Sequence, residues 1–469
     1  MSNAASAIQT IDPKMIEKYS LRGPRYTSYP TAPEWTEEVG ADIYWKHVRA
    51  TNQSGASCPL SIYIHIPFCG ERCYYCACNV IITQSEKIME RYVDSVSREA
   101  QRTAQEIAPG RRVIQFHLGG GTPTHLPPPL LERLLSKVTA LFEYDEDSER
   151  SIEVDSRVTS IEHLQVLRRF GFNRISLGVE DFFAKTQEAI NRPQDAEETN
   201  RFAQDCRRLG FESVNIDLVY GLPFQTLKTF HETLDIIYRI DPDRIALYNY
   251  AHLPEKVPHQ RKIEETSLPN AQERTAILKA AIEGFTERGY AYIGMDHFAK
   301  PDDELTLSQK EGTLQRNFMG FTTRAGADLY AFGVSAISSL PALYAQNEKN
   351  LKQYTDKVER GEAPIERGVE LTPDDRMRRW VIMELMCNLR VSAERFRELW
   401  GEDFHRYFAQ ELQSLQPFAA DGLLEPDMSQ EIRVTDIGQI IIRPIAMAFD
   451  RRLALARQRG GQTAFSKTL

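Results

Sequence analysis

The stretch that decides the fold is Cys69-Gly-Glu-Arg-Cys73-Tyr-Tyr-Cys76-Ala-Cys78, which holds four of the chain's seven cysteines. It follows Ser61-Ile-Tyr-Ile-His-Ile66, an alternating apolar run that is typical of a buried strand. Three thiolates at the spacing C-x3-C-x2-C can surround a small iron–sulfur cluster. A cubane cluster normally takes four cysteines, so a three-cysteine loop leaves one iron open to a substrate or cosubstrate.

Two other uses of these thiols are weaker. A structural zinc site normally has four ligands, often as two separate C-x2-C pairs, and the chain has no second pair. A disulfide is disfavoured because residues 1–10 do not resemble a secretory signal, and crowded cytosolic thiols indicate metal or redox chemistry. Cys58, Cys206 and Cys387 stand alone, and each is expected to be a small buried side chain or an ordinary surface thiol.

The composition is ordinary for a globular protein. The chain has 469 residues, 42% hydrophobic and 26% charged, which predicts a large catalytic domain and at least one smaller domain. No apolar run is long enough to span a bilayer, and a cytoplasmic location is expected. The formal charge of −9 argues against nonspecific nucleic-acid binding. It does not exclude an anionic substrate, because a basic pocket can lie within an acidic protein.

Residues 1–55 are polar and rich in turns, and we expect them to form an extended arm. They contain Gly23-Pro-Arg-Tyr-Thr-Ser-Tyr-Pro-Thr-Ala32, whose prolines and lack of periodicity disfavour a helix. The arm could be a surface leader. It could also fold back over a site and supply cations, because Arg22, Arg25, Tyr26 and Tyr29 are unusual in a free tail.

Residues 56–355 are expected to form an α/β catalytic domain in which strands alternate with helices. The predicted strands are 61–66, 113–118, 151–155, 174–179, 213–219 and 244–248, and the predicted helices are 86–107, 127–142, 161–169, 195–209 and 230–240. Repeated βα units imply a parallel sheet, and such sheets carry their active sites at the carboxyl ends of the strands. Because every strand end carries candidate ligands, a partial or full (β/α) barrel fits better than an open sheet.

Residues 356–469 are expected to form a mostly helical, winged-helix-like cover domain. The predicted helices are 374–388, 393–400, 405–415 and 437–457, with a hairpin between 421–425 and 432–435. Pro444 should kink the last helix or make it start late. A winged helix can bind DNA, but the acidic balance favours a lid or cover.

Glycines and polar residues follow the predicted strands. Gly119-Gly-Gly-Thr-Pro-Thr124 lets the backbone approach a ligand closely, or forms only a tight turn. Glu153 and Asp155 point the same way from one strand, toward a ligand or toward a partner such as Arg157. Tyr63 could stack on a ligand ring or belong to the core.

Over nearly its whole length, the chain resembles the oxygen-independent coproporphyrinogen III oxidases, a branch of the radical S-adenosylmethionine (SAM) enzymes. The resemblance rests on the cysteine loop and on residues 24–32, 119–124, 215–223, 248–254, 293–299, 316–318 and 333–338. Cys78 is especially discriminating, because the related haem chaperones lack the fourth cysteine and the arm motif.

The resemblance implies a 4Fe–4S cluster with two SAM molecules beside it. In this family, a reduced cluster splits SAM into methionine and a 5′-deoxyadenosyl radical, which takes a hydrogen from the β-carbon of a propionate side chain. Loss of CO2 and one electron then leaves a vinyl group. Two such reactions convert coproporphyrinogen III to protoporphyrinogen IX in anaerobic haem biosynthesis. Flavodoxin or ferredoxin is the expected electron donor, and a monomer is the expected state.

The resemblance also implies roles for individual residues. The cluster ligands are Cys69, Cys73 and Cys76, and Cys78 is an essential neighbour that is not a ligand. The first SAM is expected at Tyr63, Gly120, Glu153 and Ile337, and the second at Tyr75, Gly121, Thr122, Glu180, Arg192, Asp217 and Ala251. Because the substrate carries four carboxylates, arginines are expected around it, and Arg22, Arg25 and Arg316 are the candidates.

The sequence departs from the family pattern at five positions. Tyr75 replaces phenylalanine and Ser156 replaces proline. Met319 and Phe321 replace glutamine and tyrosine, which removes two polar groups near the expected substrate pocket. Glu180 replaces glutamine; an ionised carboxylate cannot donate a hydrogen bond, but it can attract the SAM sulfonium or ammonium.

Two other functions stay open at this point. One is a divergent radical SAM paralogue that transfers a methyl or adenosyl group to haem or another tetrapyrrole. The other is a haem-binding carrier that retains the cluster without turnover, against which Cys78 and the arm motif argue.

Overall fold

The computed structural model describes residues 13–53, 58–458 and 465, and the contacts within the chain divide it into two units. Unit 1 comprises Met1–Trp35, Leu278–Ala325 and Leu371–Leu469, and unit 2 comprises Thr36–Ile277 and Gly326–Glu370. The predicted borders after residues 55 and 355 differ from this grouping and stay a prediction. Residue 55 lies outside the described residues. So do residues 1–10, which are not expected to form a secretory signal.

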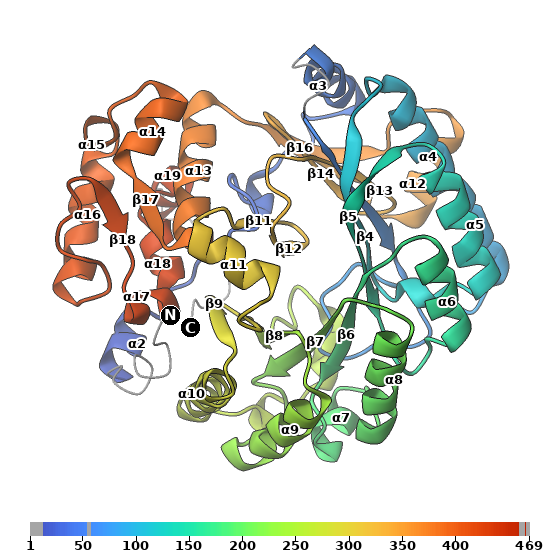
Figure 1. Cartoon of the computed structure of the whole chain (residues 1–469), viewed down its shortest axis with the longest axis horizontal. Helices are drawn as coiled ribbons and strands as arrows, with labels where there is room; N and C mark the ends of the chain where they lie inside the picture. The colour runs from blue at the N-terminus through green and yellow to red at the C-terminus, as the bar shows by residue number, and fades with distance from the viewer. Residues whose placement is uncertain (1–12, 54–57, 459–464, 466–469) are drawn as a thin grey trace. The chain divides into compact units, whose positions relative to one another are not determined.

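Unit 2 is built on a sheet with the strand order β16-β15-β14-β13-β1-β4-β5-β6-β7-β8 (Figure 1). The strands are β1 (Leu60–Ile66), β4 (Arg112–Gly120), β5 (Glu143–Val154), β6 (Arg174–Glu180), β7 (Ser213–Tyr220), β8 (Arg244–Asn249), β13 (Asp328–Phe332), β14 (Ile337–Leu340), β15 (Leu343–Asn347) and β16 (Ile365–Glu370). Neighbours from β13 to β8 are parallel, and neighbours from β13 to β16 are antiparallel. Among the described residues, β16 and β8 do not pair with each other, so this is a partial barrel and not a closed one.

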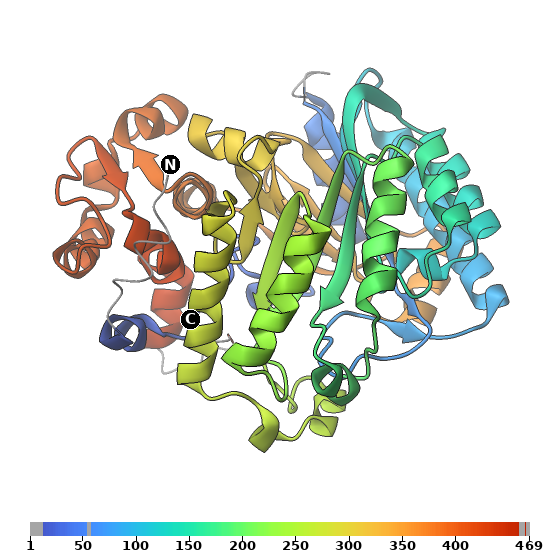
Figure 2. The same ribbon diagram turned by 60° about the horizontal axis from the view of Figure 1, so that its bottom comes forward.

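Helices cover the outer face of this sheet, as Figures 1 and 2 show for α4, α5, α6, α8 and α9. The helices of unit 2 are α3 (Ala41–Gln53), α4 (Glu86–Glu106), α5 (Pro128–Thr139), α6 (Ile161–Arg169), α7 (Ala184–Ala189), α8 (Ala196–Arg208), α9 (Leu227–Ile240) and α12 (Leu351–Glu359), with short 3-10 turns η2 (Pro123–His125), η3 (Pro258–Lys262) and η4 (Glu265–Ser267). The predicted helix 161–169 is confirmed as α6. Asp195 is the N-cap of α8 and accepts a hydrogen bond from Glu198 N at 2.8 Å.

The two faces of β1 differ, and this difference positions the site. Ile62, Ile64 and Ile66 are fully buried, whereas the alternate residues are polar. Ser61, for example, donates to Gln115 Oε1 at 2.9 Å. Because side chains alternate along a strand, one face is apolar and the other carries the polar groups.

Unit 1 contains the helices α2 (Pro13–Tyr19), α11 (Glu304–Glu311), α13 (Pro373–Asn388), α14 (Ala393–Trp400), α15 (Phe404–Tyr407), α16 (Ala409–Ala420), α17 (Asp436–Ile440), α18 (Ile442–Met447) and α19 (Arg451–Gln458) and the turn η1 (Ala32–Glu34). Its strands form three antiparallel pairs: β9 (Ala291–Gly294) with β10 (His297–Ala299), β11 (Gln315–Asn317) with β12 (Gly320–Thr322), and β17 (Arg390–Ser392) with β18 (Glu431–Arg433). Helix α10 (Ala271–Glu287) spans the border between the units.

The described residues of the arm up to Trp35 pack onto the rest of unit 1 and are not a free tail. Arg443 donates to Gly23 O at 2.5 Å and to Pro24 O at 3.0 Å. Tyr26 is buried and donates to Asp450 Oδ2 at 2.9 Å. Buried hydrogen bonds therefore hold the arm in place, in addition to apolar packing.

Two expectations about these segments are wrong. Residues 41–53 form α3 and not an extended arm, because Tyr44, Trp45 and Val48 recur at helical spacing and are buried. The hairpin between 421–425 and 432–435 shrinks to a bridge between Leu424 and Val434, and β18 pairs with β17 instead. Pro426 has no N–H with which to extend that ladder.

The last predicted helix is divided into α17, α18 and α19. The first break falls at Ile441, and Pro444 is the third residue of α18, so the proline sits in a newly started helix. Across the described residues, no helix is both long and apolar enough to cross a membrane.

Candidate active site

The cysteine loop begins where β1 ends, and its two ends are held together. Ile81 N donates to Pro67 O at 2.7 Å, and β2 (Phe68–Cys69) pairs in parallel with β3 (Ile81–Ile82). The loop that carries Cys73 and Cys76 is therefore closed at its base, and Cys69 stands on β2 itself.

The thiols of this loop have different proton affinities. Burial raises the pKa of Cys69 to about 11. Burial also raises the pKa of Cys73, although Arg192 opposes this effect. Hydrogen bonds from Cys78 lower the pKa of Cys76 to about 7, and the N–H of Cys78 lies 3.4 Å from Cys76 Sγ. Cys76 is therefore the thiol of the three that most readily becomes a thiolate, the form that binds metals.

The three predicted ligands fit an iron–sulfur cluster by their chemistry. They are thiols on one short loop, and each iron of such a cluster takes one thiolate. No three His, Cys, Asp or Glu side chains of the described residues converge closely enough to hold one metal ion. The fit to a cluster therefore rests on the number, softness and spacing of the donors.

The glycine segment at the end of β4 lies directly against the cysteine loop. Gly121 N donates to Ile66 O at 2.8 Å, and Thr122 N donates to Phe68 O at 2.9 Å. A Cβ on Gly121 would lie 2.8 Å from the backbone of Pro67. Gly120 has φ +122°, and a Cβ there would meet the His65 ring at 2.7 Å. Gly120 and Gly121 must be glycine because neighbouring atoms leave no room for a Cβ. The segment is therefore packed closely against the cysteine loop and is not only a tight turn.

Glu153 faces this segment with an accessible carboxylate. It accepts a hydrogen bond from Gly120 N at 2.9 Å, and its Oε1 lies 3.6 Å from His117 Nε2. Burial acts to raise the pKa of Glu153, but the contacts with His117 and Gly120 outweigh it and the pKa is lowered. The side chain is 46% exposed, so an anionic acceptor is available to a cationic ligand. Asp155, in contrast, forms the ion pair with Arg157 that was the alternative for both carboxylates.

Tyr63 is held among polar neighbours on the inner face of β1. Its hydroxyl lies 3.0 Å from His65 Nδ1, and its ring stacks on His117 with 5.8 Å between centroids. His65 in turn hydrogen-bonds to Asn79 O at 3.1 Å, at the far end of the cysteine loop. Tyr63 is thus fixed in orientation beside Glu153 and the glycines, and it does not belong to the apolar core.

Arg192 is the buried cation of the site. Its Nη1 donates to Asp155 Oδ2 at 3.2 Å and lies 3.6 Å from Cys73 Sγ, and its Nη2 donates to Gly178 O at 2.8 Å. Its Nε lies 3.7 Å from Glu180 Oε1. One guanidinium therefore links the cysteine loop to strands β5 and β6.

Glu180 and Asp217 are two acids on neighbouring strands; Glu180 is buried and Asp217 is partly buried. Glu180 has φ +69° and follows an irregularity in the β6–β7 register, an unusual backbone for a residue with a side chain. Burial raises its pKa, although Arg192 opposes this. Burial, and then the charge of Glu180, raise the pKa of Asp217 to about 7. Ser176 and Asn215 each donate to Asp217 at 2.9 Å.

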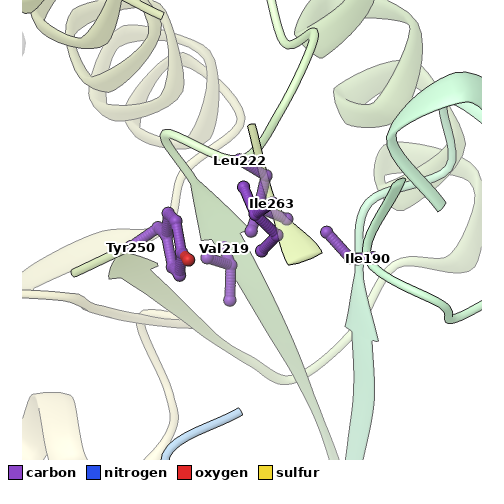
Figure 3. Close-up of a cluster of buried hydrophobic side chains, with 5 residues drawn as sticks. All are labelled: Ile190, Val219, Leu222, Tyr250 and Ile263. Atoms are coloured by element: carbon purple, nitrogen blue, oxygen red, sulfur yellow. The ribbon is translucent and has the colours of Figure 1, made fainter. Parts of the chain in front are cut away.

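Tyr75 lies beside an apolar cluster made of Ile190, Val219, Leu222, Tyr250 and Ile263 (Figure 3), and Ala251 directly follows the cluster member Tyr250 in the chain. Tyr74 and Tyr75 pack against this cluster. Tyr74 N also donates to Ile190 O at 2.9 Å. The tip of the cysteine loop is thus anchored on residues that follow β6, β7 and β8.

Sequence reasoning missed two residues that hold this tip. His259 Nε2 lies 2.6 Å from Cys76 O, and Gln260 Nε2 donates to Tyr75 O at 2.9 Å and to Ala251 O at 3.3 Å. Both lie on η3, more than 180 residues after the loop. A histidine and a glutamine in a polar segment give no local signal, and only the tertiary contact identifies them.

Ile337 begins β14, after a turn that is tied to the end of β1. Tyr92 donates to His65 O at 2.6 Å and accepts from Val334 N at 3.0 Å. Glu99 is buried and accepts from Gly333 N at 2.9 Å. Neither Tyr92 nor Glu99 was predicted, although both lie on the buried face of α4.

Arg22, Arg25 and Arg316 belong to unit 1, whereas the residues above belong to unit 2. Arg25 pairs with Asp296, and the backbone oxygen of Arg22 accepts from Arg457 at 3.1 Å. Arg316 is buried, with its guanidinium 4.7 Å from the centre of the Phe321 ring.

The other departures from the family pattern have local explanations. Phe321 pairs with Arg316 across the β11–β12 hairpin, and its ring meets His297 edge-on at 5.1 Å. Met319 stands in the turn of this hairpin, and its N–H donates to Asn317 Oδ1 at 2.8 Å. Ser156 Oγ accepts from Gln194 at 3.2 Å, so its side chain has a role besides its backbone.

Comparison with known proteins agrees with this geometry. Residues 63–237 match the model of the Radical SAM superfamily, and residues 371–441 match that of the HemN C-terminal domain. The oxygen-independent coproporphyrinogen III oxidase of Escherichia coli K12 is 44% identical over 458 residues, which cover 98% of each chain. The Synechocystis enzyme of the same name is 42% identical over 97% of each chain.

The solved structure of coproporphyrinogen III oxidase (HemN) from Escherichia coli, described as a radical SAM enzyme, superimposes with a TM-score of 0.89 at 43% identity. The superposition covers 94% of this chain and 99% of the Escherichia coli chain. The radical SAM superfamily uses a 4Fe–4S cluster and SAM, which is the pair of cofactors that the resemblance of the sequence implied. The chain belongs to the family of oxygen-independent coproporphyrinogen III oxidases.

Proposed function

We propose that this protein is an oxygen-independent coproporphyrinogen III oxidase, which decarboxylates two propionate side chains of coproporphyrinogen III to vinyl groups and yields protoporphyrinogen IX. One observation carries the proposal. Backbone hydrogen bonds join the cysteine loop to the glycine segment, and the Glu153 carboxylate accepts from Gly120 N, in a chain that is 44% identical to the Escherichia coli enzyme over 98% of each chain.

Cys69, Cys73 and Cys76 would hold the cluster as thiolates. When bound and reduced, the cluster supplies the electron that cleaves SAM into methionine and a carbon radical able to take a hydrogen atom from the substrate. The low pKa of Cys76 favours the thiolate before the metal arrives. Cys78 stands next to this ligand with its N–H toward the sulfur, which supports its role as a neighbour and not as a ligand.

SAM carries a positive charge, and the site offers carboxylates to it. Glu153 presents an exposed, hydrogen-bonded carboxylate beside Tyr63 and Gly120, and we assign these residues with Ile337 to one SAM molecule. The acids Glu180 and Asp217 lie on the neighbouring strands β6 and β7, and Glu180 contacts Arg192 beside the cysteine loop.

We assign that second group to another SAM molecule, together with Tyr75, Gly121, Thr122 and Ala251. The double assignment is supported by the presence of two separate acidic groups in one site, one at Glu153 and one at Glu180 and Asp217. Each could neutralise one cation.

The substrate carries four carboxylates, and we propose Arg22, Arg25 and Arg316 as cations that bind them. Arg25 pairs with Asp296, so a substrate carboxylate would have to compete with that acid. Arg316 stacks over the Phe321 ring, and a guanidinium held in a fixed plane is suited to bind a planar carboxylate.

We further propose that the protein acts as a monomer in the cytoplasm, receives electrons from flavodoxin or ferredoxin, and binds neither nucleic acid nor membrane. The formal charge of −9 supports the last point, because nucleic acids and anionic lipid surfaces select basic proteins.

An anaerobic assay tests the function. Reconstituted protein is incubated with dithionite, SAM and coproporphyrinogen III, and 5′-deoxyadenosine and protoporphyrinogen IX are both counted. Two deoxyadenosines per protoporphyrinogen are expected. Deoxyadenosine without decarboxylated product would reject this substrate, and a product with an added methyl or adenosyl group would support a transferase. If an intact cluster gives neither product, tight stoichiometric haem binding would favour the carrier.

A further inference from the structure

The segment that follows β8 turns back toward the cysteine loop and contacts it through adjacent side chains. His259 hydrogen-bonds to Cys76 O at 2.6 Å, and Gln260 donates to Tyr75 O at 2.9 Å. Both acceptors are backbone oxygens of the cysteine loop. One belongs to the predicted ligand Cys76, and the other to Tyr75, which lies between the predicted ligands Cys73 and Cys76. Lys262 of the same segment also packs over the Tyr74 ring, 4.4 Å from its centre.

Gln260 uses its whole amide group. Its Nε2 donates to Tyr75 O and, at 3.3 Å, to Ala251 O, and its Oε1 accepts from Leu253 N at 2.6 Å. The residue is 1% exposed. A buried amide with both its donors and its acceptor engaged fixes the three backbone groups relative to one another, because each would be costly to leave unpaired.

The apolar cluster of Figure 3 gives this arrangement a rigid base. Ile263 is a member of the cluster and its N–H donates to Gln260 O at 2.9 Å. Tyr75 packs against the same cluster from the cysteine loop. Gln260 therefore joins two segments that already rest on one core.

We infer that Gln260 is a positioning residue, which holds the cysteine loop at a fixed distance from Ala251 and so sets the spacing between the cluster and SAM. The inference rests on the proposed function, in which Tyr75 and Ala251 contact SAM and Cys76 binds the cluster. Gln260 touches neither group in this scheme and acts through the backbone of Tyr75 and Ala251.

Gln260→Glu is the decisive variant, because it keeps the shape and the acceptor for Leu253 N but loses both donors. The ionised carboxylate would face two carbonyl oxygens that it cannot satisfy. Gln309→Glu is the matched control. Gln309 Nε2 also donates to two backbone oxygens, those of Ile293 and Cys387, but in unit 1 and without contact to the cysteine loop.

The experiment uses reconstituted holoprotein under anaerobic conditions. SAM affinity is measured by calorimetry, the SAM-induced change in the spectrum of the reduced cluster by electron paramagnetic resonance, and exchange of the amides of residues 72–80 by hydrogen–deuterium exchange. Gln260→Glu is expected to weaken SAM binding about tenfold, as the loss of one to two hydrogen bonds implies. It should also alter the SAM-induced spectrum and speed exchange in residues 72–80, whereas Gln309→Glu should leave all three close to wild type.

Wild-type SAM affinity and spectrum in Gln260→Glu would overturn the inference, and so would equal changes in both variants. If Gln260→Glu does not fold, Gln260→Asn replaces it, because the shorter amide cannot reach both oxygens, and the same outcomes apply. The three readouts need no porphyrin substrate. Failure of the proposed function, seen as a wild-type protein without decarboxylated product, is therefore distinguishable from failure of this inference.

Discussion

The two sides of the candidate site are held in different ways. On the side of β4, Gly121 and Thr122 are fixed by backbone hydrogen bonds, and neither Gly120 nor Gly121 has room for a Cβ. On the side of β6 and β7, Arg192 and the acids around it are fixed by charge. The first arrangement fails when volume is added, and the second fails when charge is removed. The glycine side should therefore be insensitive to pH, whereas the charged side should respond to it.

The largest effect is expected on the charged side, from Arg192→Met. The change leaves Asp155 and Glu180 without their shared cation, and breaking a buried ion pair in this way costs about 3–5 kcal/mol of the free energy of unfolding. Melting temperature, measured by calorimetry, should fall and cluster content per chain should drop. Arg157→Met is the control, because Arg157 is more exposed and its pairing with Asp155 should contribute about 1 kcal/mol or less. Equal losses in both variants would show that Arg192 is not the central cation.

The next effect belongs to the glycine side. Gly121→Ala would place a Cβ 2.8 Å from the backbone of Pro67, which must shift and carry the start of the cysteine loop with it. Such overpacking costs about 1–3 kcal/mol, and iron content after reconstitution should decrease with it.

Gly40→Ala is the control for this change, because nothing lies within 4 Å of a Cβ at Gly40. A Gly121→Ala protein with full iron content would mean that the loop does not depend on this close approach.

This contrast also explains which parts of the site could be predicted from the sequence. The cysteines, the glycines and Glu153 are adjacent in the sequence to strands with clear alternation, so local pattern was enough to place them at strand ends. The helix 161–169 and the N-cap Asp195 followed from periodicity and from the preference of acidic side chains for helix starts. These signals are local, because side-chain alternation and helix capping depend on residues that are near one another in the sequence.

The rest depended on tertiary contacts. Gln260 and Tyr92 act on backbone groups of residues remote in the sequence, and no spacing rule reports that. Asp155 and Glu153 look equivalent on their strand, but the position of Arg192 and Arg157 separates them. The division of the last helix at Ile441 likewise reflects packing that periodicity does not record.

A smaller effect is expected from pH on the charged side. The pKa of Asp217 is raised to about 7 from 3.8, so the folded protein holds this proton between about pH 4 and 7 while the unfolded chain releases it. The free energy of unfolding is therefore highest, as far as Asp217 is concerned, below pH 4. It decreases as the pH rises to about 7 and is constant at higher pH. Asp217→Asn should remove this dependence, which thermal melts from pH 5 to 8 would record.

The same ionisation should appear in ligand binding. If SAM binds the ionised form of Asp217, a single group with a pKa of about 7 is about one-tenth ionised at pH 6 and nine-tenths at pH 8, and affinity should rise about tenfold over this range. Calorimetry on the reconstituted protein measures it, with Asp217→Asn as the control that should lose the trend. A trend that persists in Asp217→Asn would assign it to another group.

The smallest effect is expected from Glu180→Gln, which restores the residue typical of the family. Arg192 keeps its contact with Asp155 at 3.2 Å, and the ion pair it loses is long, at 3.7 Å. Because burial already opposes the charge on Glu180, replacing it by an amide of the same shape should change the free energy of unfolding by less than about 1 kcal/mol.

The charge of Glu180, however, contributes to the raised pKa of Asp217. The midpoint of the pH dependence of SAM binding should therefore move to lower pH in Glu180→Gln. It should stay in place in Glu188→Gln, which removes the same charge from an exposed position on α7. An unmoved midpoint in Glu180→Gln would mean that Glu180 and Asp217 titrate independently.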